Sequence, residues 1–86
     1  MLKSGYILRG INVIGHEVFY TGKAGDGWVD SKPSNGFLYD SFRAANRKAA
    51  LFNKASLTLG FRFIVMGYAD GRTLSAGAYE EIYTAA

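Results

Sequence analysis

Short apolar segments alternate with glycine-rich turns along the chain. Residues 6–13 (YILRGINV) and 17–21 (EVFYT) are rich in β-branched and aromatic side chains, and Ile14 and Gly15 lie between them. Two such segments separated by a glycine-containing turn are typical of a strand pair. We therefore predict two strands joined by a turn near the start of the chain.

A loop, a short strand and a second turn are expected next. Residues 22–27 (GKAGDG) have the composition of a turn or flexible loop. Residues 28–30 (WVD) predict a third strand, which must end before Pro33 because proline lacks the backbone N–H that a strand ladder uses. The sequence PSNG at 33–36 predicts a turn, and residues 37–39 (FLY) lead from it to a helix.

The main helix is predicted over residues 42–53 (FRAANRKAALFN), which are rich in alanine, the best helix former. Either Asp40 or Ser41 can cap its first turn, because both side chains accept hydrogen bonds from free backbone amides. At about 100° per residue, one helix stripe is apolar and is expected to face a sheet. It contains Phe42, Ala45, Ala49 and Phe52. The opposite stripe contains Arg43, Arg47 and Lys54.

The strongest strand pattern covers residues 57–68 (LTLGFRFIVMGY). From Phe63 onward both faces of this segment are apolar, so we expect it to lie centrally in the sheet. Residues 69–72 (ADGR) predict a turn. The pattern of residues 73–86 is ambiguous, and a helical turn after Ser75 is expected there.

These elements predict an α+β fold with a small antiparallel sheet of three to four strands and one main helix packed on one face. Their order is strand, strand, strand, helix, strand, followed by the ambiguous tail. One helix against a sheet is the simplest arrangement that buries both apolar surfaces. We expect residues 1–86 to form a single domain, because domains are most often about 100–150 residues long.

Composition narrows the class of protein. The absence of cysteine excludes a disulfide framework, a thiolate zinc site and a cysteine nucleophile, and it fits a reducing cytoplasm. No segment approaches the ~18 apolar residues of a membrane-spanning helix, so we expect a cytoplasmic protein that does not bind membranes. Ten Lys and Arg against seven Asp and Glu give a net charge of +3, which favours an acidic or nucleic-acid partner.

The sequence contains no pattern typical of catalysis or metal binding. His16 is the only histidine, and a histidine-based zinc site needs further ligands. Proximity in sequence does not show that Asp26 with Asp30, or Glu80 with Glu81, face one cleft as a catalytic pair must. Turn chemistry explains Asp26, and a solvated face explains the two glutamates. The GKAGDG loop lacks the Lys-Ser/Thr pair and the following helix of a phosphate-binding loop. We therefore expect a protein that is not an enzyme and that uses no cofactor and no metal.

The basic helix stripe and nearby aromatic residues form the candidate partner-binding surface. It comprises Trp28, Tyr20, Tyr39, Arg43, Arg47 and Lys54, with Lys48 nearby. A row of cations can follow phosphates, and exposed rings of Tyr6, Tyr20 or Trp28 can stack on unpaired bases. The outer face of an amphipathic helix is ordinarily polar as well, and a tryptophan on a strand is most often a core residue. Packing and partner binding therefore both stay open.

Several segments together resemble small orphan proteins of bacteriophages and prophages. They are YILRG, FYTGKAGDGWVDSKPSNGFLYDS, FRAANRKAALFN and GFRFIVM, within residues 5–67. The resemblance implies a compact α+β fold and stoichiometric binding that inhibits or redirects host machinery, as anti-CRISPR, anti-restriction and polymerase-modulating proteins do. These segments are packing and turn features, so the resemblance implies no functional residue.

Three function hypotheses are consistent with these observations. The first is a phage-encoded, non-enzymatic protein of the host cytoplasm that inhibits a host protein or protein–nucleic-acid complex, such as a CRISPR or other defence complex. The second is a nucleic-acid-binding module that uses the basic helix face and the sheet aromatics. The third is a structural or assembly protein of a virion, which requires self-association.

Overall fold

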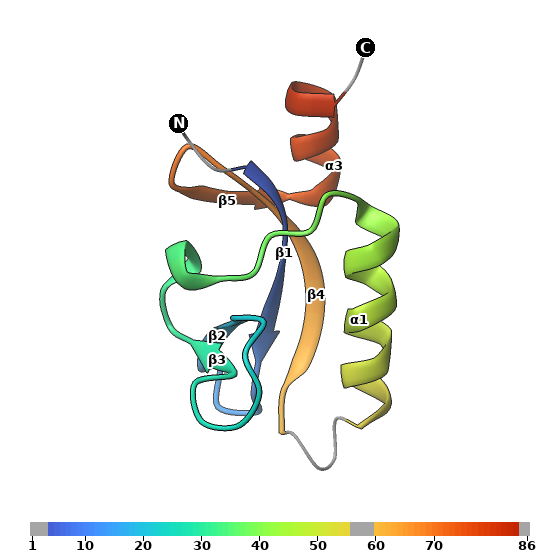
Figure 1. The fold of residues 1–86 in the computed structure, drawn as a ribbon. Coiled ribbons are helices and arrows are strands. Elements are labelled where there is room, and N and C mark those ends of the chain that lie inside the picture. Colours follow the sequence, from blue (N-terminus) through green and yellow to red (C-terminus); the bar gives the residue numbers. More distant parts are fainter. Residues whose placement is uncertain (1–3, 56–59, 85–86) are drawn as a thin grey trace.

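A five-stranded antiparallel sheet with helix α1 packed on one face forms the centre of the computed structural model, which describes residues 4–55 and 60–84 (Figure 1). The strand order is β3-β2-β1-β4-β5. The prediction of an α+β fold with an antiparallel sheet is confirmed. The predicted count of three to four strands is wrong, because the tail adds a fifth strand beside β4.

The elements follow the chain in this order. The strands are β1 (Ser4–Ile11), β2 (Glu17–Tyr20), β3 (Val29–Asp30), β4 (Arg62–Ala69) and β5 (Arg72–Ser75). The helices are the 3-10 helix η1 (Pro33–Asn35), α1 (Phe42–Lys54), α3 (Ala76–Tyr79) and the π-helix η2 (Glu80–Thr84).

The predicted first strand pair is present as β1 and β2, with Gly10 opposite Val18. Asn12 organises the turn between them, because its Oδ1 accepts hydrogen bonds from the backbone N–H groups of Ile14, at 3.1 Å, and of His16, at 2.8 Å. An asparagine side chain that bonds the backbone two residues ahead is a common turn-forming device. The short-range sequence therefore accounts for this part of the sheet.

Helix α1 begins as predicted, and the structure chooses between the two candidate caps. The Oγ of Ser41 accepts the backbone N–H of Ala44 at 3.2 Å, so Ser41 rather than Asp40 is the N-cap. Ala45 and Ala49 are buried against the sheet, as expected of the apolar stripe. Phe42, at the start of that stripe, remains 39% exposed.

The strand predicted over residues 57–68 is shorter than expected. Residues 56–59 lie outside the described residues, and β4 begins only at Arg62. Gly60 has φ +78°, a left-handed conformation that interrupts an extended strand. Strand β4 pairs with β1 over residues 62–69 and with β5 over residues 66–69, so its place in the interior of the sheet is confirmed.

Strand β5 was not predicted, because residues 73–86 were expected to contain only a helical turn. Asp70 and Gly71 have φ values of 54° and 79°, and two left-handed residues in succession form the tight turn that suits a hairpin. The chain therefore returns along β4 for the four residues of β5. The helical turn expected after Ser75 is present as α3, with Ser75 as its N-cap.

Both faces of the sheet carry a cluster of buried residues, each covered by a different part of the chain, although Ile64 of β4 remains 48% exposed. On the face under α1, a cluster of buried residues includes Tyr6, Leu8, Ala45, Ala49, Phe63, Ala69 and Tyr79. A smaller cluster contains Ile7, Phe19 and Tyr68, with Leu38 packed against it. Gly36 approaches Ile7 so closely that a Cβ atom there would lie 2.1 Å from Ile7 Cδ1. The connection from β3 to α1 thus covers the second cluster.

Candidate partner-binding groove

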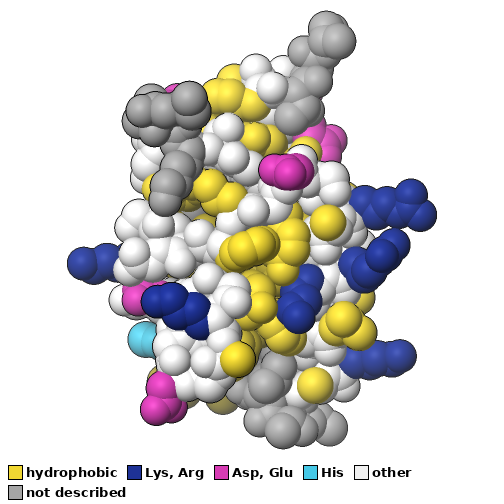
Figure 2. Space-filling view, viewed as in Figure 1, with side chains coloured by type: hydrophobic (Ala, Val, Ile, Leu, Met, Phe, Trp, Pro, Cys, Tyr) yellow, Lys and Arg dark blue, Asp and Glu magenta, His cyan; other side chains and the backbone are white. Residues whose placement is uncertain are grey.

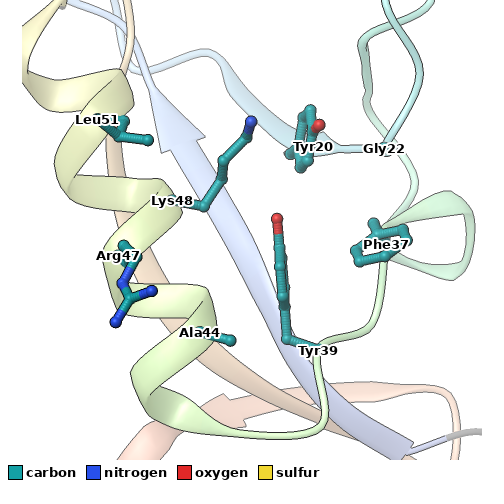
Figure 3. Close-up of a pocket in the computed structure, with 8 residues that line it drawn as sticks. All are labelled: Tyr20, Gly22, Phe37, Tyr39, Ala44, Arg47, Lys48 and Leu51. Carbon is teal, nitrogen blue, oxygen red and sulfur yellow. The ribbon is translucent and has the colours of Figure 1, made fainter.

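A groove separates α1 from β2 and residues 37–39. Its first depression has a volume of about 300 Å³, and Tyr20, Gly22, Phe37 and Tyr39 line it opposite α1 (Figure 3). From α1 it is lined by Ala44, Arg47, Lys48 and Leu51. A second depression of about 270 Å³ is lined by Tyr20, Gly22, Lys23, Ala24, Trp28, Lys48 and Phe52. The two depressions share Tyr20, Gly22 and Lys48, so we treat them as one aromatic groove.

Tyr20, Phe37 and Tyr39 form the aromatic wall of this groove, and backbone hydrogen bonds hold it in place. The N–H of Phe37 donates to the carbonyl oxygen of Tyr20 at 2.8 Å. Tyr39 forms an isolated bridge with Tyr6, in which each N–H donates to the other residue's carbonyl, at 2.8 and 2.9 Å. Residues 37–39 thereby lie along the sheet, and their side chains have fixed positions relative to α1.

Gly22 lets the ring of Phe37 pack directly against the backbone that follows β2. It has φ +84°, and a Cβ atom at this position would lie 2.6 Å from Phe37 Cδ1. A larger residue would therefore need both a strained backbone and a displaced ring. The glycine of the predicted loop has a specific packing role here.

The rings of the groove pack against one another by their edges. The ring centroids of Phe37 and Tyr39 lie 4.8 Å apart in a T-shaped arrangement, and those of Tyr20 and Phe52 lie 5.0 Å apart in the same arrangement. Such pairs stabilise their geometry beyond the area that they bury. Phe37 and Leu51 nevertheless remain 45% and 58% exposed, so the groove presents large apolar side chains to solvent.

Lys48 supplies a positive charge at the boundary of the two depressions. Its Nζ lies 5.7 Å from the ring centroid of Tyr20 and 5.2 Å from that of Phe52, within the range of a cation–π interaction. The close-up shows the amine reaching from α1 toward Tyr20 (Figure 3). Within residues 4–55 and 60–84, no carboxylate forms an ion pair with Lys48 or Arg47.

The hydroxyl of Tyr39 points into the groove between α1 and Tyr20 (Figure 3). Burial raises the pKa of Tyr39, and the nearby Tyr20 raises it further. The hydroxyl therefore keeps its proton at neutral pH and can donate a hydrogen bond to a group that enters the groove.

Four of the six predicted site residues line the aromatic groove. Tyr20, Tyr39 and Arg47 line the first depression, and Trp28 lines the second. Arg43 instead lines a third depression of about 460 Å³, together with Ser41, Ala44 and Arg47. Lys54 is exposed and lines none of these three depressions.

Two of the rings predicted to stack on bases, those of Tyr6 and Trp28, pack against other side chains of the protein. Tyr6 is 5% exposed and cannot stack on an unpaired base, so its inclusion among the exposed rings was wrong. Trp28 packs by its edge against Phe52 at 5.6 Å and Phe61 at 6.2 Å, and it is only half-buried. Trp28 thus contributes to the core with one part of its ring and lines the groove with another.

Sequence reasoning missed Gly22, Phe37 and Leu51, and it placed Lys48 only near the basic stripe. Leu51 carried a usable signal, because a large aliphatic residue between Arg47 and Lys54 interrupts a basic helix face. In Figure 2, hydrophobic side chains form a band down the centre of the molecule, and Lys and Arg side chains lie beside this band. Lys48 had no such signal, since its role depends on the position of Tyr20.

The other candidate polar residues have surface and turn positions. His16 is exposed in the turn between β1 and β2. The Oδ1 of Asp30 accepts the backbone N–H of Lys32 at 2.8 Å, so this carboxylate organises the chain after β3. Among the described residues, no group of three His, Asp or Glu side chains gathers as a metal site requires. The described helices include none with the length and apolar character to cross a bilayer.

The chain matches no family model, and searches of curated proteins and of solved structures found no significant similarity.

Proposed function

We propose that this chain is a small, non-enzymatic binding protein that engages a partner protein through the aromatic groove. The observation that carries the proposal is the exposure of Phe37 and Leu51 beside Lys48, whose charge has no ion pair within the described residues. Exposed apolar groups rimmed by polar ones are typical of an interaction surface. Tyr, Trp and Arg, which are enriched at binding hot spots, also line the groove.

The rigidity of the wall supports a binding role. Residues 37–39 are held by backbone hydrogen bonds to Tyr20 and Tyr6, and their rings are fixed by edge contacts. A surface that is already ordered loses little conformational entropy when a partner binds. More of the free energy gained by burying apolar area in the groove therefore remains as binding affinity than it would for a flexible surface.

Stoichiometric binding of this kind would inhibit or modulate the partner by occupying its surface. The resemblance to phage proteins implies the same role, with a host protein or protein–nucleic-acid complex in the host cytoplasm as the target. A CRISPR or other defence complex is the example that this proposal includes.

The proposal is tested by affinity purification from the natural host after nuclease treatment, with two matched baits. Leu51→Asp places a charge in the groove, whereas Ala50→Asp places the same charge on an adjacent exposed position of α1. We expect a partner that rebuilds a defined stoichiometric complex with purified wild-type protein and with Ala50→Asp, but not with Leu51→Asp. The proposal fails if folded wild-type protein yields no such complex, or if Leu51→Asp forms it equally well.

Nucleic-acid binding is the second candidate function. Arg43 and Arg47 together line the third depression, and Arg47 also borders the aromatic groove. Neighbouring cations of this kind can contact successive phosphates. A mobility-shift assay with single- and double-stranded DNA and RNA at about 50 mM salt tests this role, which requires a shift that weakens steeply as salt rises. Absence of a shift eliminates it.

A further inference from the structure

We infer that the aromatic groove recognises an acidic peptide segment in which a carboxylate lies between two large apolar side chains. This inference rests on the proposed function and names the chemistry of the partner. It is drawn from the arrangement of the two depressions around Lys48.

Each depression can accept an apolar side chain. Phe37 and Leu51 contribute to the first, and Trp28 and Phe52 contribute to the second. Their volumes, about 300 and 270 Å³, exceed the roughly 150 Å³ of an apolar cavity that holds benzene. A partner segment that crosses the groove therefore finds two apolar sites rather than one.

The charge between these sites is positive. Lys48 lines both depressions, while Arg47 borders only the first and Lys23 only the second. Among the described residues that line either depression, none is acidic. A carboxylate that binds at the shared boundary would meet Lys48, and further carboxylates toward the ends would meet Arg47 or Lys23. The groove thus complements an acidic segment, and complementarity of this kind rejects basic competitors.

Lys48 is prepared for such a contact. Its amine is already positioned over the rings of Tyr20 and Phe52. Less side-chain entropy is lost when a carboxylate pairs with it than when a fully mobile surface lysine is ordered. Charge-assisted hydrogen bonds to an ammonium group are also stronger than neutral ones.

The same geometry disfavours an unpaired nucleic-acid strand. Base stacking requires an open ring face, whereas Lys48 lies over Tyr20, and Phe37 and Trp28 pack edge-to-face with Tyr39 and Phe52. The lining also consists mainly of apolar and aromatic side chains, rather than of the row of cations that a phosphate backbone needs. An acidic peptide is therefore the occupant that the groove fits best.

Fluorescence of Trp28 provides the test, since it is the only tryptophan and lines the second depression. The probes are short synthetic peptides with a glutamate between two leucines, in a series that varies the leucine spacing. Matched peptides carry glutamine for the glutamate or alanine for either leucine, and a single-stranded oligonucleotide serves as competitor. We expect the glutamine or alanine peptides to bind about tenfold or more weakly than the parent peptide, as loss of a charged hydrogen bond or an apolar anchor implies.

Three variants connect this preference to Lys48. Lys48→Gln should abolish the preference for glutamate over glutamine, whereas Lys48→Arg, which keeps the charge, should retain it. Lys54→Gln makes the same change on α1 outside the groove and should leave the preference unaltered.

The inference is overturned if no peptide of the series binds, if glutamate and glutamine peptides bind equally, or if Lys48→Gln keeps the preference. It is also overturned if the oligonucleotide binds and the peptides do not. If wild-type protein shows no preference for glutamate over glutamine peptides, but Leu51→Asp still disrupts a host complex, the inference about an acidic peptide fails and the proposed function stands. An unaffected Leu51→Asp complex would instead remove the proposed function.

Discussion

The side chain of Asn53 forms two hydrogen bonds with the backbone of Phe63: its Nδ2 donates to the carbonyl oxygen at 2.9 Å, and its Oδ1 accepts from the N–H at 2.7 Å. Asn53 lies in the last turn of α1, and Phe63 lies near the start of β4. Strand β5 pairs only with residues 66–69 of β4, so Asn53 satisfies backbone groups of β4 that β5 does not reach. One asparagine thus joins the helix to the sheet.

We expect Asn53→Ala to lower the free energy of unfolding by about 2–3 kcal/mol, because two hydrogen bonds are lost and the partly buried groups of Phe63 lose their partner. Urea unfolding measures the change. Asn46→Ala is the matched control, since Asn46 is an exposed residue of the same helix. A free energy for Asn53→Ala within about 0.5 kcal/mol of wild type would show that the pair contributes little.

Gly67 provides a test of how α3 packs on the sheet. A Cβ atom at Gly67 would lie 2.2 Å from the Cβ of Tyr79, so Gly67→Ala must displace α3. We expect it to cost about 1–3 kcal/mol, as overpacked cores do. Gly77→Ala, in α3 itself, meets nothing within 4 Å and should stabilise the fold by about 0.5–1 kcal/mol through its higher helix propensity. Thermal unfolding should therefore show a lower Tm for Gly67→Ala and a higher Tm for Gly77→Ala. Equal shifts in Tm would contradict this packing of α3.

The choice of helix cap is testable by two single substitutions. Ser41→Ala removes the side chain that accepts the Ala44 N–H and should cost about 1 kcal/mol of stability. Asp40→Ala should change stability by less than about 0.5 kcal/mol, because Asp40 does not provide the cap bond. Denaturant unfolding compares the two, and a larger loss for Asp40→Ala would reverse the assignment.

Tyr39 makes the free energy of unfolding depend on pH in the alkaline range. Its pKa is raised in the folded state, chiefly by burial and then by Tyr20, so the folded protein binds this proton more tightly than the unfolded chain. The resulting stability is complete below the ordinary tyrosine pKa of 10.0 and is lost as pH rises through the folded pKa. Urea unfolding across this range should show a steeper loss for wild type than for Tyr39→Phe.

Tyr83 acts in the same direction and needs its own control. The hydrogen bond that its hydroxyl donates to Asp70, at 3.0 Å, is the main cause of its raised pKa. Tyr83→Phe should therefore remove a separate part of the alkaline transition. If Tyr39→Phe leaves the pH dependence of wild type unchanged, the contribution assigned to Tyr39 is wrong.

Local sequence patterns were sufficient for much of the fold. The alanine-rich helix, its cap at Ser41 or Asp40 and the strand pair around Gly15 depend on residues that are neighbours along the chain. Strand β5 was missed for the opposite reason. Its four residues have little periodicity of their own, and they become a strand because the turn at Asp70 and Gly71 returns them to β4.

The candidate site shows where sequence reasoning ends. Helical periodicity placed Arg43, Arg47 and Lys54 on one face of α1, because their relative directions depend only on the helix. Periodicity could not show that Lys48 lines both parts of the groove and that Lys54 lines neither. That difference arises when strand pairing brings Tyr20 opposite α1.

The sequence by itself determined the α+β class, the amphipathic helix and the supply of aromatic and basic side chains. The tertiary structure alone decided which of these side chains meet. Gly22 allows Phe37 to approach, the bridge between Tyr6 and Tyr39 positions the aromatic wall, and Lys48 then lies over Tyr20. The physical reason is that the walls of the groove come from segments that are remote in sequence. Sheet register and packing, rather than local propensity, set the distances between these segments.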